Sequence, residues 1–92
     1  MEIILKTSGT MERFFPKKEF RFVLKKGAQL SDLYEIMGRL NGPEISAAVW
    51  NHGKNRFRGP VIVKSGGRLL KNEEEILYDG QIIELKRFLI GG

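Results

Sequence analysis

The sequence predicts an α+β fold in which a mixed sheet of four to five strands carries one main helix on one face, together with a short second helix. Segments in which apolar and polar residues alternate, the pattern of a half-buried strand, occur in both halves of the 92 residues. Between them, one segment repeats apolar residues every three or four positions, the pattern of an amphipathic helix. Because two strands cannot bury an apolar face alone, we expect the helix to cover them.

The first two strands are expected at residues 2–7 and 19–25. The second is the clearest in the sequence, because Phe20 and Phe22 alternate with charged neighbours. The connector over residues 8–18 contains glycine and proline, and one helical turn within it would place Phe14 or Phe15 at the edge of the core.

The main helix is expected from residue 30 onward, where five apolar residues follow the spacing of one helical face. They are Leu30, Leu33, Tyr34, Met37 and Leu40. Asn41, Gly42 and Pro43 end this pattern, and Pro43 is suited to open a second short helix over residues 44–50. Gly38 in the middle of the main helix has no explanation in the sequence.

The second half of the chain predicts three more strands after a polar loop over residues 51–59. They are expected at residues 60–64, 68–71 and 81–87. The last strand is expected to lie beside the first and parallel to it, so that one sheet packs on the helix. The residues expected between sheet and helix are Phe20, Phe22, Leu33, Met37, Val61, Val63, Ile83 and Leu85.

The sequence ends in three apolar residues and two glycines: Phe88, Leu89, Ile90, Gly91 and Gly92. Glycine has no Cβ, so a terminal pair of glycines fits a channel too narrow for other residues. This ending suits a carboxylate that is passed into the active site of another protein. We therefore expect one domain over residues 1–92, with residues 88–92 as a mobile tail.

The composition excludes several functions. There is no cysteine, which removes disulfides, thiolate nucleophiles and thiolate metal sites. The single histidine, His52, is expected to be a surface residue in a turn, because one histidine builds neither a triad nor a metal cluster. No segment has the pattern of a signal peptide or a membrane span, so a cytoplasmic protein is expected. The net charge of +5 brings nucleic acid into consideration, but the basic residues are scattered.

The order of elements, together with the glycine ending, resembles the ubiquitin-like β-grasp proteins that carry sulfur. Within that family the chain is most similar to the small subunits of molybdopterin synthase. Thiamine-pathway carriers are shorter and usually lack the second helix. The matching segments are residues 11–16, 28–33, 42–44, 61–63, 77–80 and 91–92.

The resemblance implies a carrier that is not itself an enzyme. In such proteins an activating enzyme adenylates the terminal carboxylate, here that of Gly92 beside Gly91, using ATP and Mg²⁺ bound by that enzyme. A sulfur donor then displaces AMP and leaves a thiocarboxylate, which enters the large subunit of molybdopterin synthase. The chain would bind no cofactor or metal of its own. The alternatives are a ubiquitin-like protein modifier attached through Gly92, a thiamine-pathway sulfur carrier and, from another class, a small basic nucleic-acid-binding domain.

The same reasoning predicts a partner surface. If Ile83 and Leu85 face the helix, strand alternation sends their neighbours to the opposite face of the sheet. The expected partner-binding residues are Ile4, Ile62, Ile82, Phe88, Leu89 and Ile90, with Phe88 as the anchor.

Overall fold

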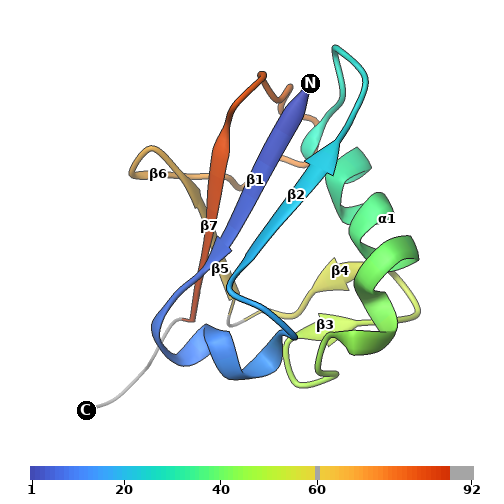
Figure 1. Ribbon diagram of the computed structural model, residues 1–92, viewed down its shortest axis with the longest axis vertical. Helices are drawn as coiled ribbons and strands as arrows, with labels where there is room; N and C mark the ends of the chain where they lie inside the picture. Colours follow the sequence, from blue (N-terminus) through green and yellow to red (C-terminus); the bar gives the residue numbers. More distant parts are fainter. Residues whose placement is uncertain (60, 88–92) are drawn as a thin grey trace.

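The computed structural model describes residues 1–59 and 61–87, and it consists of a twisted sheet with one long helix across one face (Figure 1). The strands are β1 (Glu2–Thr7), β2 (Glu19–Val23), β3 (Trp50–Asn51), β4 (Arg56–Phe57), β5 (Val61–Ser65), β6 (Arg68–Leu69) and β7 (Ile82–Arg87). The helix α1 spans Leu30–Asn41, and two 3₁₀ helices, η1 and η2, span Gly9–Phe14 and Gly42–Glu44.

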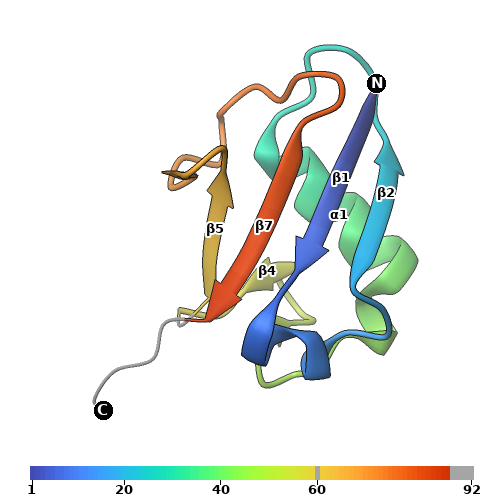
Figure 2. The same ribbon diagram turned by 60° about the vertical axis from the view of Figure 1, so that its left-hand side comes forward.

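The main sheet has five strands in the order β2-β1-β7-β5-β6. The central pair β1 and β7 is parallel, with Leu5 opposite Ile83, and the other pairs are antiparallel. Figure 2 shows β7 between β1 and β5, with α1 behind the sheet. The predicted α+β class, mixed sheet and parallel placement of the last strand are confirmed.

The core lies between the sheet and α1. Ile3, Leu5, Ile83 and Leu85 are at most 1% exposed, so the central strands bury every second residue. Of the eight predicted core residues, all are buried except Val61, which is partly buried and packs against the same cluster. The phases predicted for the strands and for most of the helix are therefore confirmed.

Leu40 is the exception on the helix, because it is 59% exposed. It lies ten residues after Leu30 and is rotated by about 80° from it around the helix axis. That rotation places Leu40 at the margin of the apolar stripe, in the last turn of α1. The apolar face predicted for the helix therefore does not extend as far as Leu40.

The first connector follows the prediction. The 3₁₀ helix η1 buries Met11 completely, and Phe15 just after it is 8% exposed. The ring of Phe15 lies 6.0 Å from that of Phe20 on β2, so the connector closes one end of the core.

The second short helix is shorter and earlier than predicted, because η2 ends at Glu44. The segment that follows turns instead of continuing the helix. The Ser46 side chain accepts a hydrogen bond from the backbone of Ala48 at 3.1 Å, a local bond that competes with helical pairing. Trp50 then begins the small β3–β4 hairpin. The predicted helix over residues 44–50 is wrong for this reason.

The β3–β4 hairpin packs on α1 and explains Gly38. Trp50 is fully buried, and its ring centre lies 4.8 Å from that of Phe57. Asn55 has a positive φ of 53°, and its side chain covers Gly38. A Cβ atom on Gly38 would overlap the Asn55 side chain, so the close approach of the hairpin requires glycine there.

Candidate functional site

Strand β7 holds the segment from which the expected reactive terminus departs. β7 pairs with β1 on one side and with β5 on the other, and its last residue, Arg87, lies opposite Val61. The Arg87 guanidinium also stands 5.2 Å from the centre of the Phe14 ring. The expected site residues Phe88, Leu89, Ile90, Gly91 and Gly92 lie outside the described residues.

The other three expected site residues lie on the face of the sheet away from α1. Ile4 and Ile82 are neighbours in the register of β1 and β7, and Ile82 is 41% exposed. Ile62 is opposite Lys86, further toward the end of β7. All three therefore share the open face, but the structure does not bring them together as one cluster.

A row of charged residues crosses the sheet between the two apolar positions. Lys6, Glu84 and Lys64 are register partners on β1, β7 and β5, and they separate Ile62 from the pair Ile4 and Ile82. Strand alternation alone does not reveal this row, because only the register between strands aligns its three members. The open face therefore offers a partner two separate apolar positions with charged residues between them.

The charges of the open face are distributed unevenly. Arg21 on β2 contacts Glu2 at 3.0 Å and Glu19 at 3.3 Å, so the positive charge that β2 presents on this face is balanced. Several lysines lie on the part of this face that is nearest the end of β7, and none of them forms an ion pair within residues 1–59 and 61–87. These lysines are Lys6, Lys64 and Lys86. This part of the face therefore carries excess positive charge beside the start of the tail.

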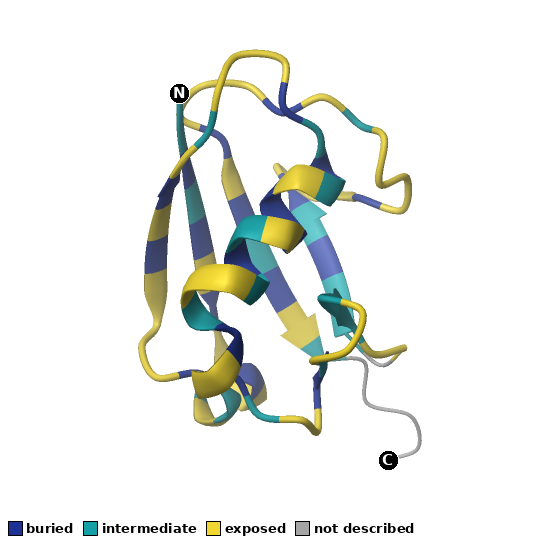
Figure 3. Cartoon of the chain, turned by 90° about the vertical axis from the view of Figure 1, so that its right-hand side faces the viewer, coloured by how far each residue is buried: buried dark blue, intermediate teal, exposed yellow. Residues whose placement is uncertain are grey.

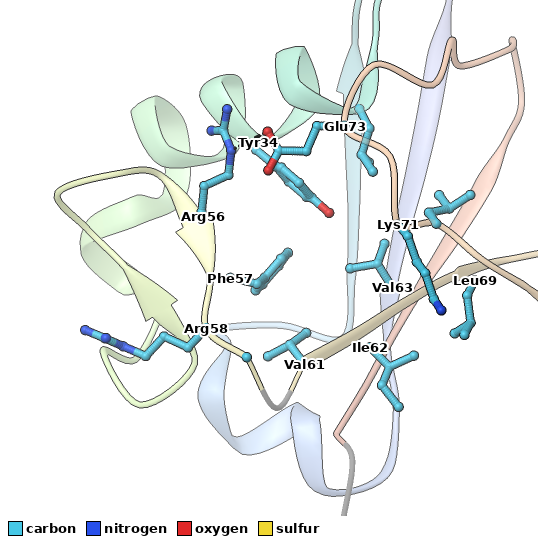
Figure 4. A pocket seen from close by; sticks show the side chains of 13 residues that line it. Tyr34, Arg56, Phe57, Arg58, Val61, Ile62, Val63, Leu69, Lys71 and Glu73 are labelled. Carbon is cyan, nitrogen blue, oxygen red and sulfur yellow. Dashed lines mark hydrogen bonds and ion pairs between the residues drawn. The ribbon is translucent and has the colours of Figure 1, made fainter.

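A hollow of about 370 Å³ lies on the other side of β5, between α1, β4 and β6 (Figure 4). Phe57 and Val63 line it together with Tyr34, whose hydroxyl points into it (Figure 4). Burial raises the pKa of Tyr34, so the phenol is neutral at physiological pH. Arg56 bounds the hollow, and its guanidinium contacts both Glu35 and Glu73 at 2.8 Å.

No catalytic constellation appears in the described residues. His52 is exposed, and its Nε2 atom lies 2.8 Å from the Gly42 carbonyl and 2.9 Å from the Ile45 carbonyl. A ring nitrogen that faces two carbonyl oxygens carries the proton and donates, so His52 holds the connector together. Within residues 1–59 and 61–87, no group of three or more His, Cys, Asp or Glu residues could hold a metal ion.

Sequence comparisons do not place the chain: no protein-family model matches it, and no curated protein matches it either. Solved structures do match. Over 100% of both chains, it superimposes on SAMP1 from Haloferax volcanii with a TM-score of 0.79 and 14% identity. The chain has the ubiquitin-like β-grasp fold.

Two further β-grasp structures agree. A chain of the complex of subunits 1 and 2 of molybdopterin-converting factor from Helicobacter pylori matches at a TM-score of 0.64 and 18% identity, over 100% of both chains. Urm1 from Trypanosoma brucei matches at 0.68 and 16%, over 99% of this chain and 95% of that one. The likeness to ubiquitin-like β-grasp proteins, predicted from the sequence, is confirmed at the level of the fold. None of the described helices is long and apolar enough to cross a membrane.

Proposed function

We propose that the chain is a sulfur carrier whose terminal Gly92 is converted to a thiocarboxylate and donates sulfur in the biosynthesis of molybdopterin. The observation that carries the proposal is the position of β7. This strand is fixed in the middle of the sheet, and five residues of the sequence follow Arg87, of which Gly92 is the last. A rigid body with a short extension ending in two glycines suits delivery of a terminal carboxylate.

The chemistry requires no side chain of this protein. The Gly92 carboxylate attacks the α-phosphorus of ATP, and pyrophosphate leaves. Hydrosulfide supplied by a sulfur donor then attacks the carbonyl carbon of the acyl-adenylate, AMP leaves with the bonding electron pair, and loss of the proton on sulfur leaves the thiocarboxylate. ATP and Mg²⁺ belong to the activating enzyme, and the donor sulfur comes from outside the chain. The absence of cysteine from the sequence is consistent with this division of labour.

The proposed partners are the activating enzyme and a large synthase subunit. One of the similar structures is a complex of subunits 1 and 2 of molybdopterin-converting factor, which supports a partner of the second kind. We place the contact on the open face of the sheet, near Ile62 and Lys86 and next to the end of β7. Phe88 would anchor the contact, with Leu89 and Ile90 beside it, while Ile4 and Ile82 would meet the partner further from the tail.

A second candidate is a ubiquitin-like protein modifier. One of the similar structures is described as H. volcanii small archaeal modifier protein 1, with a TM-score of 0.75 and 12% identity, over 96% of this chain. In that case activated Gly92 is attacked by a lysine amine instead of a sulfur nucleophile, and an isopeptide bond forms. A thiamine-pathway carrier shares the same activation step and differs in the acceptor of the sulfur.

Co-expression with a matching activating enzyme and its sulfur donor tests the proposal. The intact mass should increase by the difference between one sulfur and one oxygen atom. A variant with an alanine added after Gly92 should show no increase, because the new terminus cannot enter the narrow channel. Its thermal midpoint should be unchanged, because the core ends with Leu85 and the described strand pairing of β7 ends with Arg87.

The matched outcomes separate the candidates. Thiocarboxylate that transfers sulfur to a pterin precursor only when the large subunit is present supports the proposed pathway. Conjugates to lysines of other proteins, lost when Gly92 is deleted, support the modifier. An extended variant that still donates sulfur would contradict both, because both require Gly92 at the terminus.

A further inference from the structure

The free edge of β2 is a second surface with the features of a binding site. β2 is the terminal strand of the sheet, and among the described strands it pairs with β1 alone. Figures 1 and 2 show it at the margin of the sheet, alongside α1. β1 and β7 separate this edge from β5, the strand that pairs with Arg87 at the end of β7.

The hydrogen bonds at the two ends of β2 establish which residues face outward. The Met1 amino group donates to the Leu24 carbonyl at 2.8 Å, and the Leu24 amide donates back to Met1 at 2.9 Å. At the other end, the Thr7 amide donates to the Lys18 carbonyl at 2.9 Å. Lys18 and Leu24 thus both direct backbone groups toward β1.

In an antiparallel pair, residues that bond to the neighbouring strand alternate with residues that do not. Phe20 and Phe22, which lie between Lys18 and Leu24 at even spacing, therefore also bond to β1. Glu19, Arg21 and Val23 direct their amides and carbonyls away from the sheet. These backbone groups form a row that can pair with one more strand.

A groove of about 610 Å³ runs beside this edge, between the end of β2 and α1. Its apolar part includes Leu24 and Ile36, both half-buried. One turn after Ile36 on α1 comes the exposed Leu40, which is the residue that the core does not use. Figure 3 shows α1 from this outer side, with exposed positions along its length.

The unneutralised charge of the groove is positive. Lys25, Lys26 and Arg39 line it, and none of them forms an ion pair within residues 1–59 and 61–87. The two carboxylates of the groove do not pair with these cations. Asp32 accepts a hydrogen bond from the Gln29 amide at 2.8 Å, and Glu35 contacts Arg56 at 2.8 Å.

The opposite end of β2 also carries two lysines, Lys17 and Lys18, immediately before Glu19. Lys18 lies 3.7 Å from Glu12, whereas Lys17 forms no ion pair within residues 1–59 and 61–87. The two lysine pairs that appear scattered in the sequence therefore flank a single free strand edge. Cations at both ends of the edge and apolar side chains between them complement an extended segment that has apolar residues in its middle and acidic residues at its two ends.

We propose that the β2 edge binds an extended acidic peptide segment of a partner protein, which adds to the sheet as a sixth strand. The segment would pair with the backbones of Glu19, Arg21 and Val23. Alternate apolar side chains would lie against Leu24 and Ile36, and flanking carboxylates would meet the lysine pairs. This inference goes beyond the proposed function and does not depend on it.

Amide hydrogen exchange gives the most direct test. The probe is a synthetic peptide with alternating valine and threonine residues, flanked on each side by two glutamates. Saturating peptide should slow exchange at the amides of Glu19, Arg21 and Val23. Exchange at Phe20 and Phe22 should change little, because these amides already bond to β1. Deleting Gly91 and Gly92 should leave the result unchanged, which separates it from the carrier proposal.

Binding measurements on variants provide a second test. Arg21→Pro removes an outward amide without taking a hydrogen bond from β1, and it should weaken peptide binding by about tenfold or more. Arg21→Ala is the matched control, because it loses the same ion pairs but keeps the amide, and its affinity should remain near that of the natural chain. Circular dichroism establishes that each variant is folded.

Charge reversal at the groove, Lys25→Glu/Lys26→Glu, should weaken binding of the acidic peptide by about tenfold at low salt and by less at high salt. Lys54→Glu/Lys71→Glu makes the same charge change away from the groove and should bind normally. A dissociation constant weaker than about 1 mM for the natural chain would overturn the proposal. So would protection spread equally over Phe20, Arg21 and Phe22.

Discussion

The central strands and the connector over residues 42–59 both pack against α1, but they are held there by different means. β1 and β7 bury Leu5 and Ile83 by simple alternation, so any apolar residue of similar size satisfies the position. The connector depends on individual pairs: Asn55 on Gly38, and Arg56 between Glu35 and Glu73. Strand positions that are buried by alternation accept other apolar residues of similar size. Positions in the connector that depend on one particular contact do not accept such replacements.

The largest expected effect belongs to the central strands. Ile83→Ala should reduce the free energy of unfolding by about 2–5 kcal/mol, because Ile83 is completely buried and its truncation leaves a cavity. Ile82→Ala, one residue earlier and 41% exposed, is the matched control and should cost less than about 1 kcal/mol. Urea denaturation measures both. Equal costs would mean that the two faces of β7 do not differ as described.

The connector should respond to the addition of a single methyl group. Gly38→Ala places a Cβ atom where the Asn55 side chain lies and should destabilise the protein by about 1–3 kcal/mol. Asn55→Gly removes that side chain and suits the positive φ of the position. The double variant should therefore recover most of the loss, and thermal denaturation of all four proteins completes the cycle. Additive losses would contradict a direct contact between Gly38 and Asn55.

The smallest effect should appear in the dependence of stability on pH. Hydrogen bonds from Arg56 and then Asn55 lower the pKa of Glu35 below its ordinary value of 4.5. The ionised Glu35 thus stabilises the folded state above pH 4.5, and this contribution is lost as the pH falls through the lowered pKa.

Glu35→Gln should therefore be less stable than the natural chain at neutral pH, and the difference should shrink between roughly pH 5 and pH 2. Denaturation midpoints across that range provide the measurement. Glu74→Gln is the control, because Glu74 is exposed and forms no ion pair in the described residues. A difference that grows on acidification would show that Glu35 is not held by Arg56.

The same contrast explains how far the sequence predicts the structure. Strand and helix periods were sufficient for the strands of the main sheet, for most of the phase of α1 and for the buried residues, because burial on one face leaves a repeating pattern. The helix expected over residues 44–50 was wrong, because the local bonds of Ser46 and the burial of Trp50 leave no periodic signal. The roles of Gly38 and His52 depend on residues distant in sequence or on backbone carbonyls, which no periodicity reveals.

The two candidate binding surfaces, the open face of the sheet and the free edge of β2, were also only partly predictable from the sequence. Alternation placed Ile4, Ile62 and Ile82 on the open face, but only the register shows that Lys6, Glu84 and Lys64 divide them. The free edge of β2 had no signal in the sequence, because an edge is a property of sheet order. The proposed reactive residues Gly91 and Gly92, by contrast, stand out only in the sequence.

The parallel pairing of β1 with β7 has a consequence for synthesis of the protein. A ribosome makes Glu2–Thr7 first and reaches Ile82–Arg87 only after most of these 92 residues have been made. Until β7 emerges, β1 has β2 as its only partner, and β5 has no strand through which to join them. A chain that stops before Ile82 lacks both the strand that unites the sheet and the glycines beyond it. Completion of the fold and production of the terminal glycines are therefore linked in time.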